Sequence, residues 1–228
     1  MTRRFLSPVL LVALKESHLM SNEQQPAKRT RLRGEERRAL MLLSAKHVFA
    51  RSTYAEASTG ELARESEVTE PMLYKHFGSK KGLFLAVLNE FGMQFLDLLQ
   101  ERVSRRAEKD VLEALEHVVT DYNATIKADP ETQRILFQAV TESGDPDIAR
   151  CVSKHNLIVY GLIRQLVERA LQDGYLDPAI STDTAAWGYM SMILALQYSV
   201  MLNLSGDVAR VQEEMSRIWL RGLRTHEL

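Results

Sequence analysis

Residues 57–81, ASTGELARESEVTEPMLYKHFGSKK, contain the pattern that decides the fold. Ser58 and Glu61 have the spacing of a capping box, which predicts the first turn of a short helix. After a turn of a few residues, Thr69 and Pro71 mark the start of a second short helix, because proline is tolerated in a first helical turn. Two short helices joined by a tight turn, after a longer helix, predict a helix-turn-helix motif.

Helical spacing recurs along the rest of the chain. Apolar residues return at steps of three and four, and no run of alternating β-branched residues predicts a strand. We therefore expect an all-α fold of about nine helices. The predicted helices are 34–51, 58–65, 69–76, one from Ser79, one from Val111 ended by Asp129-Pro130, 131–142, one from about Ile148 to Gly174, 183–204 and 207–224.

Composition and charge narrow the class of protein. The 228 residues are 45% hydrophobic and 26% charged, as in an ordinary globular protein. The single cysteine, Cys151, excludes an internal disulfide framework and is typical of a reducing compartment, so we expect a cytoplasmic location. Residues 1–83 hold 15 Lys+Arg and 9 Asp+Glu, whereas residues 84–228 hold 14 and 21. A basic N-terminal part beside an acidic remainder predicts contact with a polyanion.

Two apolar segments raise the question of a membrane. Residues 1–19 begin with a basic pair and an apolar stretch, but a proline interrupts it and no small-residue cleavage site follows. We favour an extension upstream of a start at Met20 over an export signal. Residues 184–206 carry no charge, yet polar residues dilute them and no basic residue flanks them. We expect this segment to be buried all round, or shared with a second subunit, rather than to span a membrane.

The helix-turn-helix pattern is part of a longer resemblance from about Glu35 to Phe91. Its landmarks are AKHVFA at 45–50, Tyr54, Ser58, Leu62-Ala63, Val68-Thr69 and above all LYKHFGSKKGLF at 73–84. In these residues the chain resembles the TetR family of bacterial transcriptional repressors. The remaining 137 residues match that family only in length and helical content.

Two residues depart from the family pattern. The family usually has glycine at the positions of Glu67, in the turn of the motif, and Thr53, before the aromatic Tyr54. A non-glycine residue at positive φ costs on the order of 1–2 kcal/mol. Either the turns differ from those of the family, or the domain is less stable.

The resemblance implies a DNA-binding domain over residues 34–82, with the motif at 58–77, after a leader over 1–33. Its second motif helix would enter the major groove of double-stranded DNA. The residues implied to contact DNA are Ser58, Thr59, Thr69, Glu70, Pro71, Met72, Tyr74, Lys75, His76 and Lys80, with a basic arm of Lys28, Arg29, Arg31 and Arg33. Of these, Glu70, Pro71, Met72 and Lys75 are the candidates for base edges. The alternatives are a solvated tail for the arm and a helix-dipole role for Glu70.

Residues 83–228 would form a domain that binds a small-molecule effector and makes the homodimer. By resemblance, the last two helices pair with those of a second subunit and set two recognition helices about 34–36 Å apart. The candidate dimer residues are Trp187, Met190, Leu194, Tyr198, Met201, Val211, Met215 and Trp219. A pocket for an apolar or aromatic effector would be lined by Phe91, Phe95, His117, Tyr122, Arg134, Phe137, Gln138, His155, Tyr160 and Trp187.

Metal binding and catalysis find little support. Cys151 with His155, and His117 with Asp121, are spaced i, i+4 on one helix face, but such lone pairs are common, so we favour core or pocket histidines and expect no metal or cofactor. Metalloprotease, serine-hydrolase and phosphate-loop motifs are absent from the sequence. We therefore expect a ligand-responsive, sequence-specific repressor and not an enzyme; the alternatives are a DNA-independent helical adaptor and a small helical enzyme. The sequence does not identify the operator or the effector.

Overall fold

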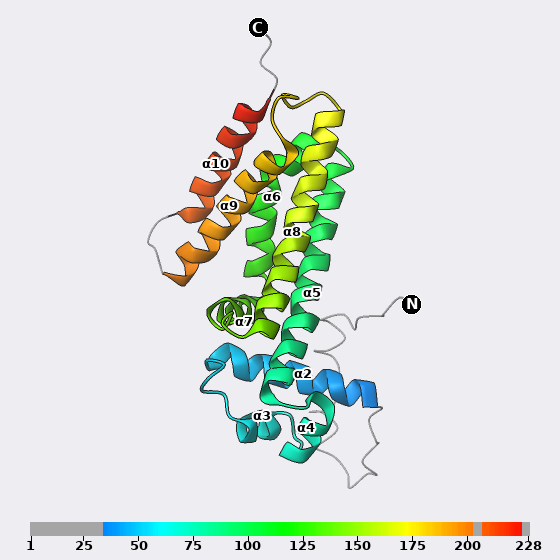
Figure 1. Ribbon diagram of the computed structural model, residues 1–228, viewed down its shortest axis with the longest axis vertical. Coiled ribbons are helices and arrows are strands. Elements are labelled where there is room, and N and C mark those ends of the chain that lie inside the picture. Colours follow the sequence, from blue (N-terminus) through cyan, green and yellow to red (C-terminus); the bar gives the residue numbers. More distant parts are fainter. Residues whose placement is uncertain (1–33, 203–206, 225–228) are drawn as a thin grey trace, which may run out of the picture. The chain divides into compact units, whose positions relative to one another are not determined.

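The computed structural model describes residues 34–202 and 207–224, and within these ranges the chain is all-α (Figure 1). The predicted fold class is confirmed: there are nine helices there and no strand, only one isolated bridge between Leu176 and Arg224. The leader and the basic arm lie outside the described residues. The helices are α2 (Gly34–Arg51), α3 (Thr59–Glu65), α4 (Glu70–Phe77), α5 (Lys80–Ala107), α6 (Val111–Lys127), α7 (Pro130–Thr141), α8 (Pro146–Gln172), α9 (Thr182–Met201) and α10 (Val208–Leu223).

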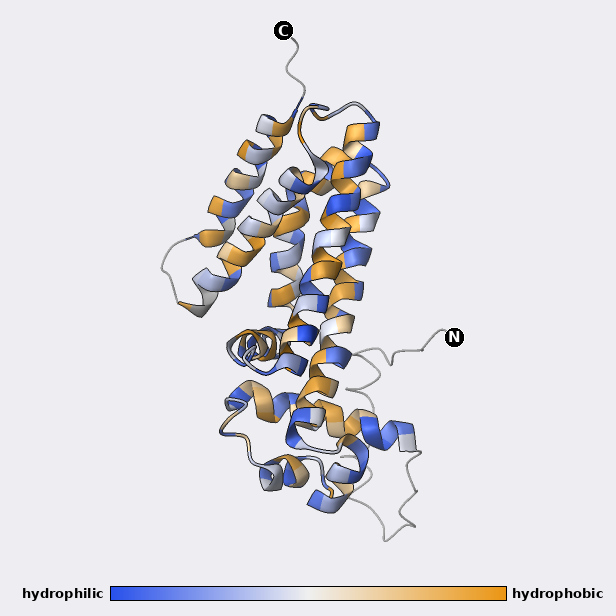
Figure 2. Cartoon of the chain, viewed as in Figure 1, coloured by the Kyte–Doolittle hydropathy of each residue, from blue (hydrophilic) through white to orange (hydrophobic). Residues whose placement is uncertain are grey.

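The chain divides into two compact units, Met1–Gln94 and Phe95–Leu228. In the first unit, α2 is the central helix, and Met41, Leu42, Ala45, Val48 and Phe49 are buried along it. This burial follows the three-and-four spacing in the sequence and gives α2 a broad apolar side (Figure 2).

An aromatic cluster closes the core of the first unit. Phe49 packs edge-on against Phe84 of α5 with ring centroids 5.0 Å apart, and Tyr54 lies 4.7 Å from Phe84. Tyr54 and Phe84 were both landmarks of the family resemblance, and the cluster gives them a shared packing role.

The turn between α3 and α4 has the left-handed backbone that the family pattern implies. Glu67 lies at φ 52°, which makes it the single non-glycine residue with positive φ in the described part of the chain. Its N–H and that of Val68 donate to carbonyls at the end of α3, which closes the turn. Thr53 needs no such conformation, because its N–H and hydroxyl both donate to the Glu56 carboxylate.

The approach of α4 to α5 requires a glycine. A Cβ built on Gly82 would lie 2.0 Å from the carbonyl oxygen of Phe77. No side chain fits at that distance, so Gly82 lets the first turn of α5 lie against the end of α4. The glycine in the KKGLF part of the family string is thus a packing requirement.

The second unit is a helical bundle in which α6 packs against α8, α9 and α10. Val111, Leu115, Val118, Tyr122 and Ile126, the stripe recognised in the sequence, are all buried along α6. The helix α9, which contains most of the uncharged segment 184–206, does not pass as a candidate membrane span. Among the described helices, α5 is the one long and apolar enough to cross a bilayer by length and composition, and half of that window is buried in the protein.

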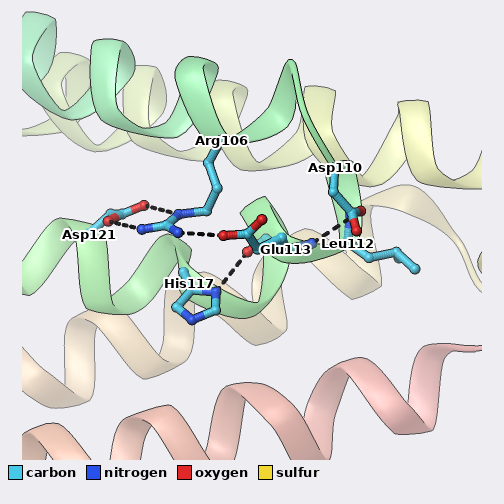
Figure 3. A network of polar contacts seen from close by, with 6 residues as sticks. All are labelled: Arg106, Asp110, Leu112, Glu113, His117 and Asp121. Atoms are coloured by element: carbon cyan, nitrogen blue, oxygen red, sulfur yellow. Dashed lines mark hydrogen bonds and ion pairs between the residues drawn. The ribbon is translucent and has the colours of Figure 1, made fainter.

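A part-buried ion-pair network joins the end of α5 to α6 (Figure 3). The Arg106 guanidinium donates to both carboxylate oxygens of Asp121, at 3.1 and 3.2 Å, and to Glu113 at 2.7 Å. These hydrogen bonds, chiefly those to Asp121, raise the pKa of Arg106 above its ordinary value. Because Asp121 is buried, loss of Arg106 would leave its carboxylate without this ion-pair partner.

A tryptophan makes a close contact between α9 and α10. A Cβ built on Gly188 of α9 would lie 2.2 Å from the Trp219 ring of α10, so the indole lies directly on the α9 backbone. The Trp219 indole N–H also donates to the Ala185 carbonyl at 3.3 Å.

The strained turn generates the first prediction. Replacing Glu67 with glycine relieves about 1–2 kcal/mol of left-handed strain, offset by about 0.5–1 kcal/mol of extra chain entropy. We expect Glu67→Gly to raise the free energy of unfolding by up to about 1 kcal/mol, measured by urea denaturation. The control Arg64→Gly, inside α3, should lower it by about 0.5–1 kcal/mol. If Glu67→Gly and Arg64→Gly lowered the free energy of unfolding equally, position 67 would not be strained.

Candidate nucleic-acid interface

The two motif helices each bury a narrow apolar edge and expose the rest. In α3, Leu62 and Ala63 are buried, and in α4 only Leu73 is. The opposite side of α4 leaves Tyr74 41% exposed, with its neighbour Lys75 also exposed. Of the other residues predicted to contact DNA, Ser58, Thr69, Glu70 and Pro71 are exposed, and Thr59, Met72, His76 and Lys80 are half-buried.

The start of α3 forms half of the predicted capping box. The Ser58 hydroxyl oxygen accepts from the Glu61 N–H at 3.1 Å, as the spacing predicts. The return contact differs from the prediction, because the Glu61 carboxylate accepts from Arg51 of α2 at 2.9 Å. Arg51 also donates to Glu65 at 3.1 Å, so an exposed ion-pair cluster ties α3 to α2. The sequence analysis did not single out Arg51.

The start of α4 differs from the expected cap in a similar way. Thr69 occupies the N-cap position with an extended backbone, but its side chain makes no cap hydrogen bond. Pro71 lies in the first turn of the helix, as the sequence pattern predicts.

The Glu70 carboxylate is held by the neighbouring helix. Its Oε2 accepts from the Thr59 hydroxyl at 2.9 Å, and its Oε1 lies 3.3 Å from the position of a Cβ on Gly60. A side chain at position 60 would therefore crowd the carboxylate. Since the single hydroxyl hydrogen of Thr59 is used here, a phosphate contact from Thr59 depends on its backbone N–H.

Lys80 has a structural role in place of the predicted phosphate contact. Its Nζ donates to the carbonyl oxygens of Tyr54, Ala55 and Ala57 at 2.9, 3.3 and 3.1 Å, and lies 4.8 Å from the Tyr54 ring centroid. An ammonium group has three N–H donors, so these carbonyls leave none for DNA. Lys80 fixes the loop before α3 to the first turn of α5.

The residues predicted to line an effector pocket are only partly brought together. Tyr122, Phe137 and His155 line one cavity of the second unit, and Phe95 packs its ring 5.2 Å from Tyr122 and 5.5 Å from His155. Gln138 lies on the same helix as Phe137 but outside the lining. The sequence analysis missed the other lining residues, which are Ile126, Gln133, Leu136, Val140, Val152, Asn156 and Gln197.

The other residues predicted for the pocket lie elsewhere. Phe91 is buried in the first unit under the Lys46 ammonium, and the exposed Arg134 lies outside both described cavities. Tyr160 packs against Trp187 with ring centroids 5.6 Å apart and planes tilted by 41°, and Trp187 is 56% exposed, so this pair lies at the surface. His117 bonds to the Glu113 carbonyl through Nδ1 (Figure 3).

The two spacings considered for a metal do not form a larger ligand cluster. Asp121, the partner of His117 in one spacing, is occupied by Arg106. No group of three or more His, Cys, Asp or Glu side chains within residues 34–202 and 207–224 could hold a metal ion.

The predicted dimer residues include both exposed and buried side chains. Trp187, Tyr198, Val211 and Met215 are exposed, whereas Leu194 and Trp219 are half-buried. Met190 is a correction: it is 3% exposed and already packed inside its own unit, so it has almost no surface left for a partner. The side chain of Met201 lies outside the described residues. Leu202 and Ile218, which the sequence analysis did not name, are also exposed, at 60% and 67%.

Comparison with known proteins agrees with this geometry. Residues 42–87 match the family described as bacterial regulatory proteins, tetR family. The transcriptional activator FasR of Mycolicibacterium smegmatis is 31% identical over 120 residues, which cover 51% of this chain and 54% of FasR. The chain thus matches about half of the length of FasR. The transcriptional regulator UidR of Escherichia coli K12 is 24% identical over 197 residues, 84% of this chain and 90% of UidR.

Solved structures share the whole fold. The transcriptional regulator FadR of Bacillus subtilis superposes with a TM-score of 0.68 at 14% identity, covering 81% of this chain and 98% of FadR. The matched segment, 42–87, contains the exposed face of α4 and the turn at Glu67. Residues 42–87 therefore carry a match to the TetR family, and the chain is similar to helix-turn-helix transcriptional regulators.

The Lys80 contacts generate the second prediction. Hydrogen bonds to charged groups contribute about 1.5–3 kcal/mol, so Lys80→Met should lower the free energy of unfolding by about 2–3 kcal/mol. The control Lys75→Met, on the exposed face of α4, should change it by less than about 0.5 kcal/mol. Both values come from urea denaturation. If Lys80→Met were as stable as the original protein but bound DNA more weakly, Lys80 would contact phosphate and would not have the structural role.

Proposed function

We propose that the protein is a homodimeric repressor that binds an inverted-repeat DNA operator and leaves it when a small apolar or aromatic effector binds. Residues 34–82 would bind DNA and residues 83–228 would bind the effector and the second subunit, in the cytoplasm, where the operator is. The observation that carries the proposal is the exposed side of α4, with Tyr74 and Lys75 outward and Leu73 buried beneath them.

The chemistry of α4 suits base and phosphate contacts. Lys75 can donate to guanine or to phosphate, and the exposed Pro71 can contact a thymine methyl group. The Glu70 carboxylate, oriented by Thr59, can accept from the N4 amino group of cytosine. An exposed carboxylate near phosphates weakens non-specific binding, so Glu70 would contribute selectivity at the expense of affinity.

An exposed apolar face on α9 and α10 supports the homodimer. This dimer face consists of Trp187, Tyr198, Leu202, Val211, Met215 and Ile218. On α10, Val211, Met215 and Ile218 follow steps of four and three, as in a seam between packed helices, and Tyr198 of α9 lies four residues before Leu202. Large exposed apolar side chains gathered on two neighbouring helices mark an interaction site. Two copies joined here would present two α4 helices to one operator.

The cavity around Tyr122 and His155 supports the effector part of the proposal. FadR of Bacillus subtilis was crystallised in complex with stearoyl-CoA, whose acyl chain is apolar, and that protein has the same fold. Effector binding would shift the population toward a state whose recognition helices no longer match successive grooves. The helix α5 belongs in part to each unit and would carry the change.

The DNA contact generates the third prediction. Lys75→Ala should weaken binding to DNA from the region upstream of the gene about 5- to 30-fold, because one contact of this kind is lost. Fluorescence anisotropy measures the affinity, and the circular dichroism spectrum should stay unchanged. Glu70→Ala should instead relax the preference at one base pair in a binding selection. If the original protein does not bind this DNA even at low salt, the alternative function of a DNA-independent helical adaptor is favoured.

The sign of regulation needs a separate measurement. A reporter gene placed behind the same upstream region should be expressed less when the protein is present and more when the effector is added. Expression that rises with the protein alone would make it an activator, as the name of FasR states for that relative.

The dimer face generates the fourth prediction. Ile218→Asp places a charge in the proposed interface of both copies, where it would lose hydration without a partner. We expect a monomer in sedimentation equilibrium and at least about 100-fold weaker operator binding, because two joined half-sites bind far better than one. The control Leu98→Asp, on α5 and 37% exposed, should remain a dimer. A monomeric control, or a dimeric Ile218→Asp, would contradict this interface.

A further inference from the structure

The cavity of the second unit has walls from four helices and no charged lining. Its lining residues come from α6 (Tyr122, Ile126), α7 (Gln133, Leu136, Phe137, Val140), α8 (Val152, His155, Asn156) and α9 (Gln197). We propose that this cavity binds an uncharged effector with an apolar body and one hydroxyl or amide group, which hydrogen-bonds to His155. This inference rests on the proposed function, because it names the chemical class of the effector.

His155 supplies an unused polar atom. Its Nε2 is buried and has no hydrogen-bond partner in the described part of the chain. The ring is held in place by stacking on Phe95, at 5.5 Å between centroids and 28° between planes. Buried polar atoms are normally paired, so an orphan nitrogen at a cavity wall marks the place of a missing partner.

The imidazole of His155 is neutral at neutral pH. Burial lowers its pKa to about 4, since the charged form would lose its hydration. A neutral imidazole has one donor nitrogen and one acceptor nitrogen, so Nε2 offers a single donor or a single acceptor. A hydroxyl or amide group both donates and accepts, and therefore pairs with either tautomer.

Tyr122 of α6 provides a second anchor in the same cavity. Its side chain is 1% exposed, and its hydroxyl oxygen accepts a hydrogen bond from the Gln197 carboxamide of α9. Burial raises the pKa of Tyr122 to about 12, which keeps the phenol protonated. Its O–H can then donate to an oxygen of the bound molecule. An effector with one polar group can meet Tyr122 and His155 together.

The lining works against charged ligands. A carboxylate or an ammonium group entering the cavity would lose its hydration, and no Lys, Arg, Asp or Glu lines it to compensate. The nearest basic candidate from the sequence, Arg134, is exposed and outside the lining. Fatty acids and organic cations should therefore bind less well than alcohols, phenols or amides with the same apolar body.

The cavity must open to accept such a molecule. Its free volume is about 30 Å³, room for only about two water molecules. Four of the ten lining residues come from α7, a helix of 12 residues, of which Val140 is 38% exposed. We expect α7 to be the wall that moves when the effector enters.

The test uses a matched set of probes and the full-length protein. The probes are 1-decanol, decanamide, decanoate and decyltrimethylammonium, with n-undecane as the apolar reference. Isothermal titration calorimetry measures their affinities. We expect 1-decanol and decanamide to bind at least ten-fold more tightly than decanoate and decyltrimethylammonium. The rate of amide hydrogen exchange in α7 should change when 1-decanol binds.

Two variants locate the polar contact. His155→Leu removes Nε2 while keeping the volume, so the preference for 1-decanol over n-undecane should fall about ten-fold. The melting temperature of His155→Leu, measured without ligand, shows that the variant is folded. The matched control is Gln165→Leu on α8, which lines the second cavity and should retain the preference.

The possible results separate this inference from the proposed function. Tighter binding of decanoate, no binding of either neutral probe, or a preference lost in Gln165→Leu but kept in His155→Leu would each overturn the inference. Operator binding by the unliganded protein tests the proposed function on its own. If operator binding responds only to an anionic probe, the proposed regulatory function stands, but the proposal of an uncharged effector is wrong.

Discussion

The Lys80 ammonium group, in the first turn of α5, donates to three backbone carbonyls of the loop that leads into α3. That loop ends at Ser58, the cap of α3, and α3 holds Glu70 of α4 through the Thr59 hydroxyl. One cation therefore determines where the first motif helix begins, and the first helix orients a carboxylate on the second. The exposed side of α4 depends on this chain of contacts, although Lys80 itself has no donor left for DNA.

The second unit uses its polar groups in a different way. Arg106 neutralises the buried Asp121 where α5 meets α6, and this pair fixes a helix end without forming a binding site. The cavity around His155 has the opposite character, since its polar atoms are neutral and one of them is unpaired. The charge of Arg106 and Asp121 thus serves structure, and the proposed recognition in the cavity depends on uncharged polar groups.

Much of the fold could be predicted because helical periodicity and capping residues are local signals. The predicted range of α2 matched to the residue, and of the two alternatives left open for the turn at Glu67 the structure has the left-handed one. Tertiary partners were harder to predict. The sequence places Lys80 beside a helix start but does not show which carbonyls surround it, and Met190 lies on the same apolar helix as Trp187 although only Trp187 is exposed. A uniformly apolar helix has no periodic signal to tell its two faces apart.

The contact between Trp219 and Gly188 affects how two copies of this chain can move. Because the indole lies directly on the backbone of α9 and its N–H is bonded to Ala185, α9 cannot slide along α10 without breaking that bond and driving the ring into main-chain atoms. The two helices therefore move as one rigid unit. In the proposed homodimer, a rearrangement between subunits would then be a rotation of one α9–α10 pair against the other, because sliding within a pair is blocked.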